Sequence, residues 1–463
     1  MKLTGHEIIE ACRGNLLQGN PGQQVTGFAI DSRQARPGDF FIPFEGEHTD
    51  GHLFIAGAVK AGAVGAFHHR SKTPDPEIPP GFLLVGVDDS LSALQQLAAE
   101  YRKRFELPVI GITGSSGKTT TKDFTAGVLS AKYDVLKTTG NLNNEIGLPL
   151  TILQLEKHHR AAVLEMGMSA RGEITTLCEI ADPSIGVITN IGEAHIEQLG
   201  SIEAIAEAKG ELLDYLGSGG VAVLNGDDPR LLEIRKRYPG KAYCYGFNQG
   251  DIKGLKLSLR GEKSFFRVRF PDKSEGMFES PLPGRESVGN ALAALTVGYI
   301  LGLTLPEMEK GLRSSEATAG RLQVMRTKQG LNIIDDTYNA NPDSVRAALN
   351  VLSDMGGSET VAVLGDMLEL GPASREAHVA VGRHAAGLGI GYLVTVGEMA
   401  RHAAAEAESA GLKSYPCSDH DEALAVLKKL PLGENWYVMV KGSRGMQMEK
   451  IVHNLFGEEG AGG

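Results

Sequence analysis

Short apolar runs alternate with amphipathic, helix-like stretches along most of the chain. Four runs with the length of buried strands precede residue 314 and four follow it, at 109–113, 161–164, 185–189, 221–224, 332–334, 361–364, 392–396 and 436–440. Strands that alternate with helices form parallel sheets whose two faces are covered by those helices. The pattern therefore predicts an α/β fold.

Two interruptions of this pattern predict domain boundaries. Residues 71–81 contain four prolines and predict a surface loop, before a strand at 82–87 and a helix at 91–105 that follows the N-cap candidate Ser90. The segment SSEATAGR interrupts the alternation again at 314–321. The 463 residues suit about three domains of about 150 residues each. We therefore expect domains at 1–85, 86–313 and 314–463.

Two further segments depart from the parallel pattern. LKLSLR at 255–260 and FFRVRF at 265–270 alternate apolar and polar residues, which predicts an antiparallel flap on the central domain. The last residues, GEEGAGG at 457–463, predict a frayed end.

Composition narrows the class of protein. The chain is 42% hydrophobic and 22% charged, as is usual for a globular protein. Its 57 acidic residues outnumber its 46 lysines and arginines, which gives a formal charge of -11. This surplus disfavours nucleic acid as a partner but leaves room for small phosphate-bearing ligands, because a few local groups hold such ligands.

The cysteines and the N-terminal residues indicate a cytoplasmic protein. The cysteines are far apart and form no C-x-x-C pair, which favours reduced thiols over a disulfide framework or a zinc site: Cys12, Cys178, Cys244 and Cys417. The first residues, MKLTGHEIIEACRGN, lack the apolar core of a signal peptide. Apolar runs of about 18 residues are missing too, so we expect no membrane span.

The strongest local motif is a phosphate loop. It follows the apolar strand VIGI, opens an amphipathic stretch, and consists of Thr113, Gly114, Ser115, Ser116, Gly117, Lys118, Thr119 and Thr120. In this context backbone N–H groups and a helix N-terminus bind phosphate, with Lys118 along the β- and γ-phosphates and Thr119 on Mg²⁺. Ile112 takes the place of the first glycine of the usual motif. The alternative is a glycine-serine turn with a solvated lysine.

Two side chains follow strands at the sheet edge where ligands bind. Glu165 closes the run AAVLE, and its carboxylate suits Mg²⁺. His195 lies in ITNIGEAHIE, just past another strand. If these strands are neighbours, the two side chains meet. Taken alone, each residue also fits a surface or structural role.

Lys209 occupies an unexpected position on a predicted helix. At about 100° per residue, the stretch SIEAIAEAKGELLDYLG places it in the middle of the face formed by Ile202, Ile205, Ala206, Leu212, Leu213 and Leu216. Burial of an unpaired ammonium is costly, so this lysine is paired, neutral or modified. A neutral amine can react with CO₂ to give a carbamate, which is a metal ligand. The alternative is a side chain that extends to the helix edge.

Several motifs carry no function on their own. Residues 387–391, GLGIG, lie after a helix and before a strand, so they indicate a connecting turn rather than a dinucleotide site. Residues 227–230, DDPR, indicate a turn that starts a helix. The pairs at 68–69 and 158–159, both His-His, have no partner pair at metal-ligand spacing.

The phosphate loop, Glu165, His195 and Lys209, in this order, resemble the Mur ligase family of cytoplasmic peptidoglycan synthesis. The resemblance covers essentially the whole chain. Four more segments carry it: TTGNLNNEIGLPLT at 138–151, DDTYNANPDS at 335–344, LGDMLELG at 364–371 and KGSR at 441–444.

The resemblance implies a central P-loop ATPase domain with a parallel sheet, flanked by an N-terminal UDP-binding α/β domain and a C-terminal Rossmann-like domain. The UDP-sugar end would contact Asp31, Ser32, Arg33, Asp50 and His52, and the muramoyl peptide would contact Asn141 and Asn144. Magnesium would be held by Thr119, Glu165, His195 and a carbamylated Lys209. ATP would contact Asn290, Arg321, Asp336 and Asn339.

The implied reaction joins D-alanyl-D-alanine to UDP-N-acetylmuramoyl-tripeptide at the expense of ATP, through an acyl phosphate. Lys118 and magnesium would offset the repulsion between the carboxylate and the γ-phosphate. Arg321, at the second boundary, would contact phosphate and respond to domain closure, which excludes water. We expect a monomer that acts on small molecules.

Other functions remain open at this point. A sister ligase that adds the third amino acid would carry a D-N-P-R motif in the third domain, whereas DDPR lies in the central one. A folylpolyglutamate synthase is a second relative to consider. A P-loop kinase or a nucleotide-gated binding protein has no evident need of Lys209 inside an apolar helix face.

Overall fold

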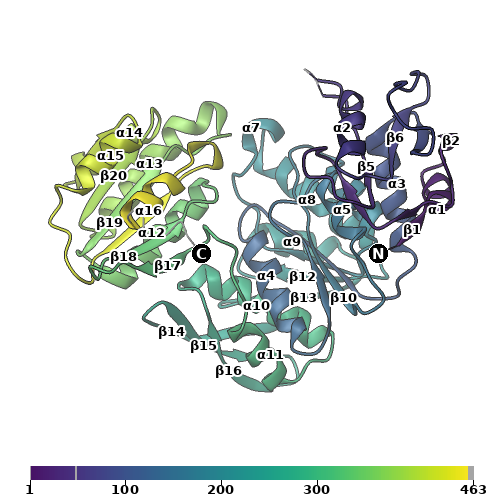
Figure 1. Cartoon of the computed structure of the whole chain (residues 1–463). Helices are drawn as coiled ribbons and strands as arrows, with labels where there is room; N and C mark the ends of the chain where they lie inside the picture. The colour runs from purple at the N-terminus through teal and green to yellow at the C-terminus, as the bar shows by residue number, and fades with distance from the viewer. Residues whose placement is uncertain (1, 47–48, 457–463) are drawn as a thin grey trace. The chain divides into compact units, whose positions relative to one another are not determined.

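The computed structural model describes residues 2–46 and 49–456 (Figure 1). The predicted frayed end at 457–463 lies outside the described residues. By their internal contacts, residues 1–111, 134–167 and 172–184 form a first compact unit, and residues 112–133, 168–171 and 185–463 form a second.

The first unit begins with a small α/β domain. Its five-stranded sheet has the order β2-β7-β6-β5-β4, with strands β2 (Asn15–Gln18), β4 (Gly27–Ala29), β5 (Asp39–Phe41), β6 (Gly65–His69) and β7 (Leu83–Val87). β2 is antiparallel to β7, and the other neighbours are parallel. A second, two-stranded sheet pairs β1 (Leu3–Thr4) with β3 (Gln24–Val25). Phe41, Ile55, Ala66 and Leu84 pack in the core.

The first unit also contains the predicted helix near residue 91. This helix, α3 (Ser90–Arg102), begins one residue earlier than predicted, because the side chain of Asp89 rather than Ser90 caps it by accepting the Ser92 N–H at 2.7 Å. The remaining elements of the unit are α1 (Gly5–Ala11), η1 (Gly51–Phe54), α2 (Ile55–Lys60), α5 (Gly147–Ile152), α6 (Glu173–Ala181) and the parallel pair β9 (Val135–Lys137) and β10 (Ala161–Glu165).

The second unit holds the phosphate-loop helix and a sheet of mixed direction. β8 (Val109–Thr113) leads into helix α4 (Lys118–Ser130). Neighbouring strands are β11 (Ile185–Ile188), β12 (Val221–Asn225), β13 (Lys241–Gly246), β14 (Ile252–Arg260), β15 (Lys263–Arg269) and β16 (Glu275–Ser280). β11 to β14 pair in parallel, whereas β14, β15 and β16 pair antiparallel, which confirms the predicted flap.

The helices of this part differ in how they are buried. Val288, Leu292 and Leu295 are fully buried on α10 (Arg285–Ile300), a helix that is largely enclosed. The other helices are α7 (Ile196–Leu199), α8 (Ile202–Leu216), α9 (Pro229–Arg237) and α11 (Leu305–Arg313). Asp228 caps α9 and Pro229 is its first residue, so the motif DDPR does start a helix, as predicted.

The C-terminal part, green to yellow in Figure 1, is a six-stranded sheet with helices on both faces. Its order is β17 (Gln323–Arg326), β18 (Asn332–Asp336), β22 (Tyr437–Lys441), β19 (Thr360–Gly365), β20 (Tyr392–Val396) and β21 (Lys413–Cys417), and only β17 is antiparallel to its neighbour. One core cluster includes residues of α12 (Pro342–Gly356), α13 (Ser374–Gly387) and α14 (Ala400–Ser409). The other includes residues of α15 (His420–Leu427) and α16 (Glu449–Phe456). The four strands predicted here are confirmed.

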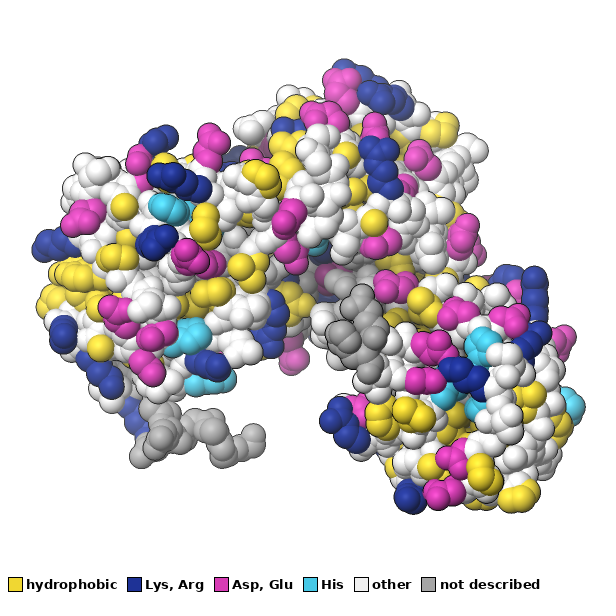
Figure 2. Space-filling view, turned by 90° about the horizontal axis from the view of Figure 1, so that it is seen from above, with side chains coloured by type: hydrophobic (Ala, Val, Ile, Leu, Met, Phe, Trp, Pro, Cys, Tyr) yellow, Lys and Arg dark blue, Asp and Glu magenta, His cyan; other side chains and the backbone are white. Residues whose placement is uncertain are grey.

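The remaining short elements are η2 (Gly371–Ala373) and η3 (Arg444–Met446). The predicted turn at 387–391 joins the end of α13 to β20. All four cysteines are buried, and none of them forms a disulfide. Among the described helices, none has both the length and the apolarity that a membrane crossing requires. Basic and acidic side chains are interspersed over the face seen in Figure 2.

Candidate active site

The phosphate loop in the second unit is braced by the segment that follows β11. Ser115 N–H donates to Asn190 O at 3.1 Å, and Ser116 N–H donates to Asn190 Oδ1 at 2.9 Å. Thr189 Oγ1 donates to Ser116 O at 2.6 Å, while Gly192 N–H donates to Ser115 Oγ at 2.8 Å. Backbone and side-chain atoms of the second segment thus fix the first. Sequence reasoning singled out His195 in this segment but missed Thr189 and Asn190, although polar residues directly after a strand were a signal.

Two glycines of the loop are required by the backbone and by close neighbours. Gly114 has a φ of 147° and Gly117 a φ of 78°. A Cβ at Gly114 would lie 1.9 Å from Thr189 Oγ1, and a Cβ at Gly117 would lie 2.5 Å from Asn290 Oδ1. Only glycine fits both constraints. The predicted ATP contact Asn290 therefore lies against the phosphate loop, where Thr121 Oγ1 also donates to it at 3.2 Å.

Lys118 and Thr119, the loop residues expected to contact phosphate and Mg²⁺, make contacts inside the second unit. Lys118 Nζ donates to Gly114 O at 2.7 Å, so its charge lies over the loop. Thr119 is buried, and its Oγ1 is 3.2 Å from a guanidinium nitrogen of Arg321. The Arg321 guanidinium also stacks on the Tyr338 ring, 4.0 Å from its centre. The structure thus brings together a linker arginine and the phosphate loop.

A cavity of about 610 Å³ opens beside the phosphate loop. On one side it is lined by Ser116, Gly117, Thr120 and Asn290, and on another by residues of the C-terminal part such as Asp336 and Lys441. Its size lies in the range of a nucleotide site, roughly 300–1,000 Å³.

The motif DDPR does more in this cavity than start a helix. Asp227 accepts N–H groups of Phe247, Asn248 and Gln249 at 2.8–3.0 Å, and thereby holds the loop that ends β13. Asp228 Oδ2 accepts the Ile191 N–H at 2.8 Å. The sequence interpretation of a mere turn was therefore incomplete.

Asp336 and Asn339, both predicted to touch ATP, are engaged with protein atoms. Asp336 Oδ2 lies 2.6 Å from Lys441 Nζ, and its Oδ1 accepts the Leu322 N–H at 3.2 Å. Asn339 O accepts from Lys441 at 3.0 Å, while its Oδ1 accepts the Arg444 N–H at 3.3 Å. Asp336 lines the large cavity, whereas Asn339 lines a smaller one.

This smaller cavity, of about 160 Å³, lies on the other side of the phosphate loop. It is lined by Ser115 and Lys118 of the loop, by His195, and by residues from the segments 335–344, 364–371 and 441–444: Asn339, Ala340, Asn341, Leu368, Glu369, Leu370, Ser443 and Arg444. Ser443 links two of these segments, because its Oγ accepts the Leu368 N–H at 2.9 Å and donates to Ala340 O at 3.2 Å.

His195 faces this smaller cavity from a strained backbone. Its φ is 65°, and its Nδ1 lies 3.2 Å from Oε2 of Glu369, whose φ is 62°. Burial, together with the charges of Lys118 and Lys209, lowers the pKa of His195 to about 4. The imidazole is therefore neutral at physiological pH, which is the form that ligates a metal.

Lys209 is buried, as its position on α8 predicted. Its exposed fraction is 1%, which excludes the alternative of a side chain that extends to the helix edge. Most of the predicted apolar face is buried with it, but Ile202 and Ala206 are only half-buried. Burial, and then the charge of Lys118, lower the pKa of Lys209 well below its ordinary value.

Glu165 belongs to the first unit, where it lies at the end of β10. Its backbone N–H donates to Thr138 Oγ1 at 3.0 Å, and its Oε1 accepts from Asn143 Nδ2 at 2.8 Å. Oε2 is buried and has no hydrogen-bond partner among the described residues. Sequence reasoning named Asn141 and Asn144 but missed Asn143, which is the asparagine that touches this carboxylate.

Asn141 and Asn144 are exposed. Asn144 Oδ1 accepts the Gly147 N–H at 2.9 Å and so orders the first turn of α5. This contact leaves the rest of its amide at the surface of the first unit.

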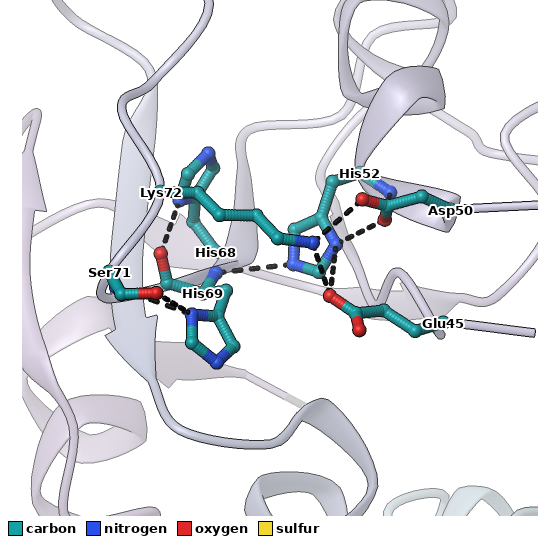
Figure 3. Close-up of polar contacts among 7 residues, drawn as sticks. All are labelled: Glu45, Asp50, His52, His68, His69, Ser71 and Lys72. Carbon is teal, nitrogen blue, oxygen red and sulfur yellow. Dashed lines mark hydrogen bonds and ion pairs between the residues drawn. The ribbon is translucent and has the colours of Figure 1, made fainter.

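The residues predicted for the UDP-sugar end fall into two groups. Asp31 and Arg33 form an exposed pair at 2.8 Å, next to Ser32, and Arg33 lowers the pKa of Asp31 to about 2. Asp50 and His52 are engaged with protein atoms (Figure 3). His52 Nδ1 lies 2.6 Å from Asp50 Oδ1, and its Nε2 accepts the His69 N–H at 3.1 Å.

Glu45, Asp50 and His52 place one ligand atom each within 4.8 Å of one another, as a metal site would. Lys72 Nζ, however, contacts both Glu45 and Asp50, the latter at 2.7 Å (Figure 3). The lysine supplies the positive charge that a cation would bring.

Comparison with known proteins places this architecture in a family. Three family descriptions match in succession: "Mur ligase family, catalytic domain" at 24–102, "Mur ligase middle domain" at 112–298, and "Mur ligase, glutamate ligase domain" at 320–444. A protein of Bacillus subtilis named UDP-N-acetylmuramoyl-tripeptide--D-alanyl-D-alanine ligase is 39% identical, over 98% of each chain. The chain belongs to the Mur ligase family.

Solved structures show the Mur ligase fold over the same length. The crystal structure of MurF from Acinetobacter baumannii superposes with a TM-score of 0.90 at 34% identity, over 98% of this chain and 99% of that one. MurF ligase from Thermotoga maritima in complex with ADP gives a TM-score of 0.82 at 30% identity, over 93% and 97%. The three-domain Mur ligase fold expected from the sequence is thus confirmed.

Proposed function

We propose that this Mur ligase joins D-alanyl-D-alanine to UDP-N-acetylmuramoyl-tripeptide at the expense of ATP, giving the pentapeptide precursor of peptidoglycan. The observation that carries the proposal is that one phosphate loop lines two cavities. Ser116 and Gly117 face the large one, and Ser115 and Lys118 face the small one. A ligase needs such an arrangement, since ATP and the carboxylate that accepts its γ-phosphoryl group must meet, and the amine must then reach the acyl carbon. The names of the relatives supply the substrates.

The same comparison supports the binding of a different ligand by each domain. We assign the UDP-sugar to residues 1–85, ATP to residues 86–313, and the dipeptide to residues 314–463. Asp31, Ser32 and Arg33 have side chains at the surface of the first domain, where a ligand can reach them. Asn339, Leu368 and Arg444 are suited to the dipeptide, because they line the small cavity. A cytoplasmic monomer is sufficient for this chemistry.

Magnesium fits the residues that the resemblance assigned to it. Glu165 has a buried carboxylate oxygen without a hydrogen-bond partner among the described residues, which is costly unless a cation or water binds there. Thr119 supplies a hydroxyl and His195 a neutral ring nitrogen, and hard oxygen donors are the preferred ligands of Mg²⁺. Bound magnesium would neutralise phosphate charge. Thr119, Glu165, His195 and Lys209 would hold it.

Lys209 would contribute as a carbamate. Its amine is enclosed on the apolar face of α8, in a setting that disfavours the ammonium form. A neutral amine attacks CO₂, forms an N–C bond and releases one proton, which leaves an anionic oxygen ligand in place of a cation. This conversion reconciles a lysine with its buried position.

The reaction then follows from charges and positions. A carboxylate oxygen of the tripeptide attacks the γ-phosphorus and ADP leaves, while Lys118 and the loop N–H groups offset the negative charges. The dipeptide amine attacks the acyl carbon and loses a proton, and inorganic phosphate leaves with the bridging oxygen. Asn290, Arg321 and Asp336 line the large cavity and would contact the nucleotide there. Closure around the intermediate protects it from water.

Phosphate release tests the proposal. Purified protein is supplied with ATP, Mg²⁺ and UDP-N-acetylmuramoyl-tripeptide, with either lysine or diaminopimelate as the third residue. We expect release only when D-alanyl-D-alanine is also present. Release with UDP-muramoyl-dipeptide plus a diamino acid, and not with these substrates, would instead assign the chain to a sister ligase.

A further inference from the structure

One face of the phosphate-loop helix α4 carries three residues that meet the connection between the central and C-terminal domains. Thr119, Asp123 and Gly127 are four residues apart, so they lie above one another on the helix. The connection, residues 314–322, follows the end of α11 and precedes β17. It runs along this face in the opposite direction.

Asp123 makes the strongest of these contacts. Its Oδ2 accepts the Thr318 N–H at 3.0 Å and the Thr318 hydroxyl at 2.7 Å. Lys122 Nζ lies 3.2 Å from Oδ1, and both side chains are 1% exposed. Hydrogen bonds to an ionised acceptor in such surroundings are stronger than neutral ones. Aspartate is a poor residue for a helix interior, so packing alone does not explain it there.

Gly127 brings the start of the connection close to the helix. A Cβ at this position would lie 2.0 Å from Ser315 Oγ and 3.0 Å from Gly311 O. Ser315 is buried, and its Oγ donates to Gly311 O at 3.0 Å. The connection is therefore packed on α4 before it reaches Thr318.

The far end of the connection is held by the C-terminal domain. Leu322 N–H donates to Asp336 Oδ1 at 3.2 Å, and Arg321 stacks on Tyr338. Arg321 thus lies between two fixed points of the connection. Thr318 is bonded to Asp123 of α4, and Leu322 is bonded to Asp336 of β18. The Arg321 guanidinium meets Thr119 Oγ1 between these two points.

We propose that Asp123 is a positioning residue for the ligation reaction, which fixes residues 315–322 on α4 so that Arg321 meets the phosphate loop. This inference rests on the proposed function for its assay. Asp123 touches neither cavity, so its effect reaches the reaction through Arg321.

A double-mutant cycle between Asp123 and Arg321 tests this role. We expect Asp123→Ala and Arg321→Ala each to lower kcat of dipeptide-dependent phosphate release about tenfold, with the KM for ATP changed less than about twofold. In the Arg321→Ala background, Asp123→Ala should have no further effect on kcat. Thr318→Val should lower kcat by a smaller factor. Thr318→Ser keeps the hydroxyl, so its kcat should stay near that of the unsubstituted protein.

Controls separate the inference from folding and from the proposed function. Asp134→Ala, at an exposed carboxylate just beyond α4, should behave as the unsubstituted protein. If Asp123→Ala lowered kcat by the same factor with Arg321 present and with Arg321→Ala, the positioning role would be overturned. A change confined to the KM for ATP would overturn it too. If Asp123→Ala does not fold, Thr318→Val in the same cycle decides. Absence of dipeptide-dependent release by the unsubstituted protein would refute the proposed function instead.

Discussion

The phosphate loop and the Asp31–Arg33 segment are both predicted ligand sites, but the structure holds them in different ways. Side chains distant in sequence, Thr189, Asn190 and Asn290, brace the phosphate loop. Asp31 and Arg33 are held mainly by each other, and the Arg33 side chain is 87% exposed. The phosphate loop is therefore fixed before a ligand binds, whereas the Asp31–Arg33 segment is free to adapt to one.

The largest effect should come from the loop's charge. Lys118→Ala should lower kcat about 10²–10³-fold, because it removes the cation that offsets the phosphate charge in the transition state. Lys132→Ala, which removes an exposed lysine beyond α4, is the control. Steady-state phosphate release measures both. A loss below about threefold in the Lys118 variant would contradict the account.

The next effect concerns Lys209. Lys209→Ala should lower kcat about 10²-fold, because an anionic ligand is lost, and acetate should restore part of it. Lys209→Arg, which leaves no room for acetate, should not respond. Independently of activity, protein equilibrated with carbon-13 bicarbonate should show a carbamate resonance that Lys209→Ala lacks. An unmodified lysine in the active enzyme would refute the carbamate.

A smaller effect should come from the loop backbone. Gly117→Ala should raise the KM for ATP about tenfold, because a positive φ and the contact with Asn290 both oppose a Cβ. Gly219 is open to solvent and has no such φ, so Gly219→Ala should leave the KM unchanged. Equal KM values for the two variants would mean that the loop is not fixed in the way described.

The smallest effect should come from a substitution in the Asp31–Arg33 segment. Arg33→Ala should change kcat less than about twofold, and the KM for the UDP substrate only modestly, because an exposed pair contributes little by itself. Initial rates at varied UDP substrate measure both constants. A loss as large as that of Gly117→Ala would show that the Asp31–Arg33 segment is as firmly organised as the phosphate loop.

The sequence predicted the parts of this site that depend on local pattern. Strand-loop-helix order located the phosphate loop, and the helix period placed Lys209 inside α8. The sequence could not reveal that Asn143 contacts Glu165, or that Thr189 and Asn190 contact the phosphate loop, because these contacts join segments far apart in the chain. For the same reason, the sequence did not reveal that Asp227 and Asp228 accept hydrogen bonds from distant backbone N–H groups.

In the proposed reaction, ATP bound at the phosphate loop activates the tripeptide carboxylate by phosphorylating it. The most direct measurement follows oxygen-18 placed in the terminal carboxylate of UDP-N-acetylmuramoyl-tripeptide. If the carboxylate attacks ATP, one labelled oxygen should appear in the inorganic phosphate released with D-alanyl-D-alanine, as mass spectrometry can detect. Unlabelled phosphate, formed together with the amide product, would contradict the account.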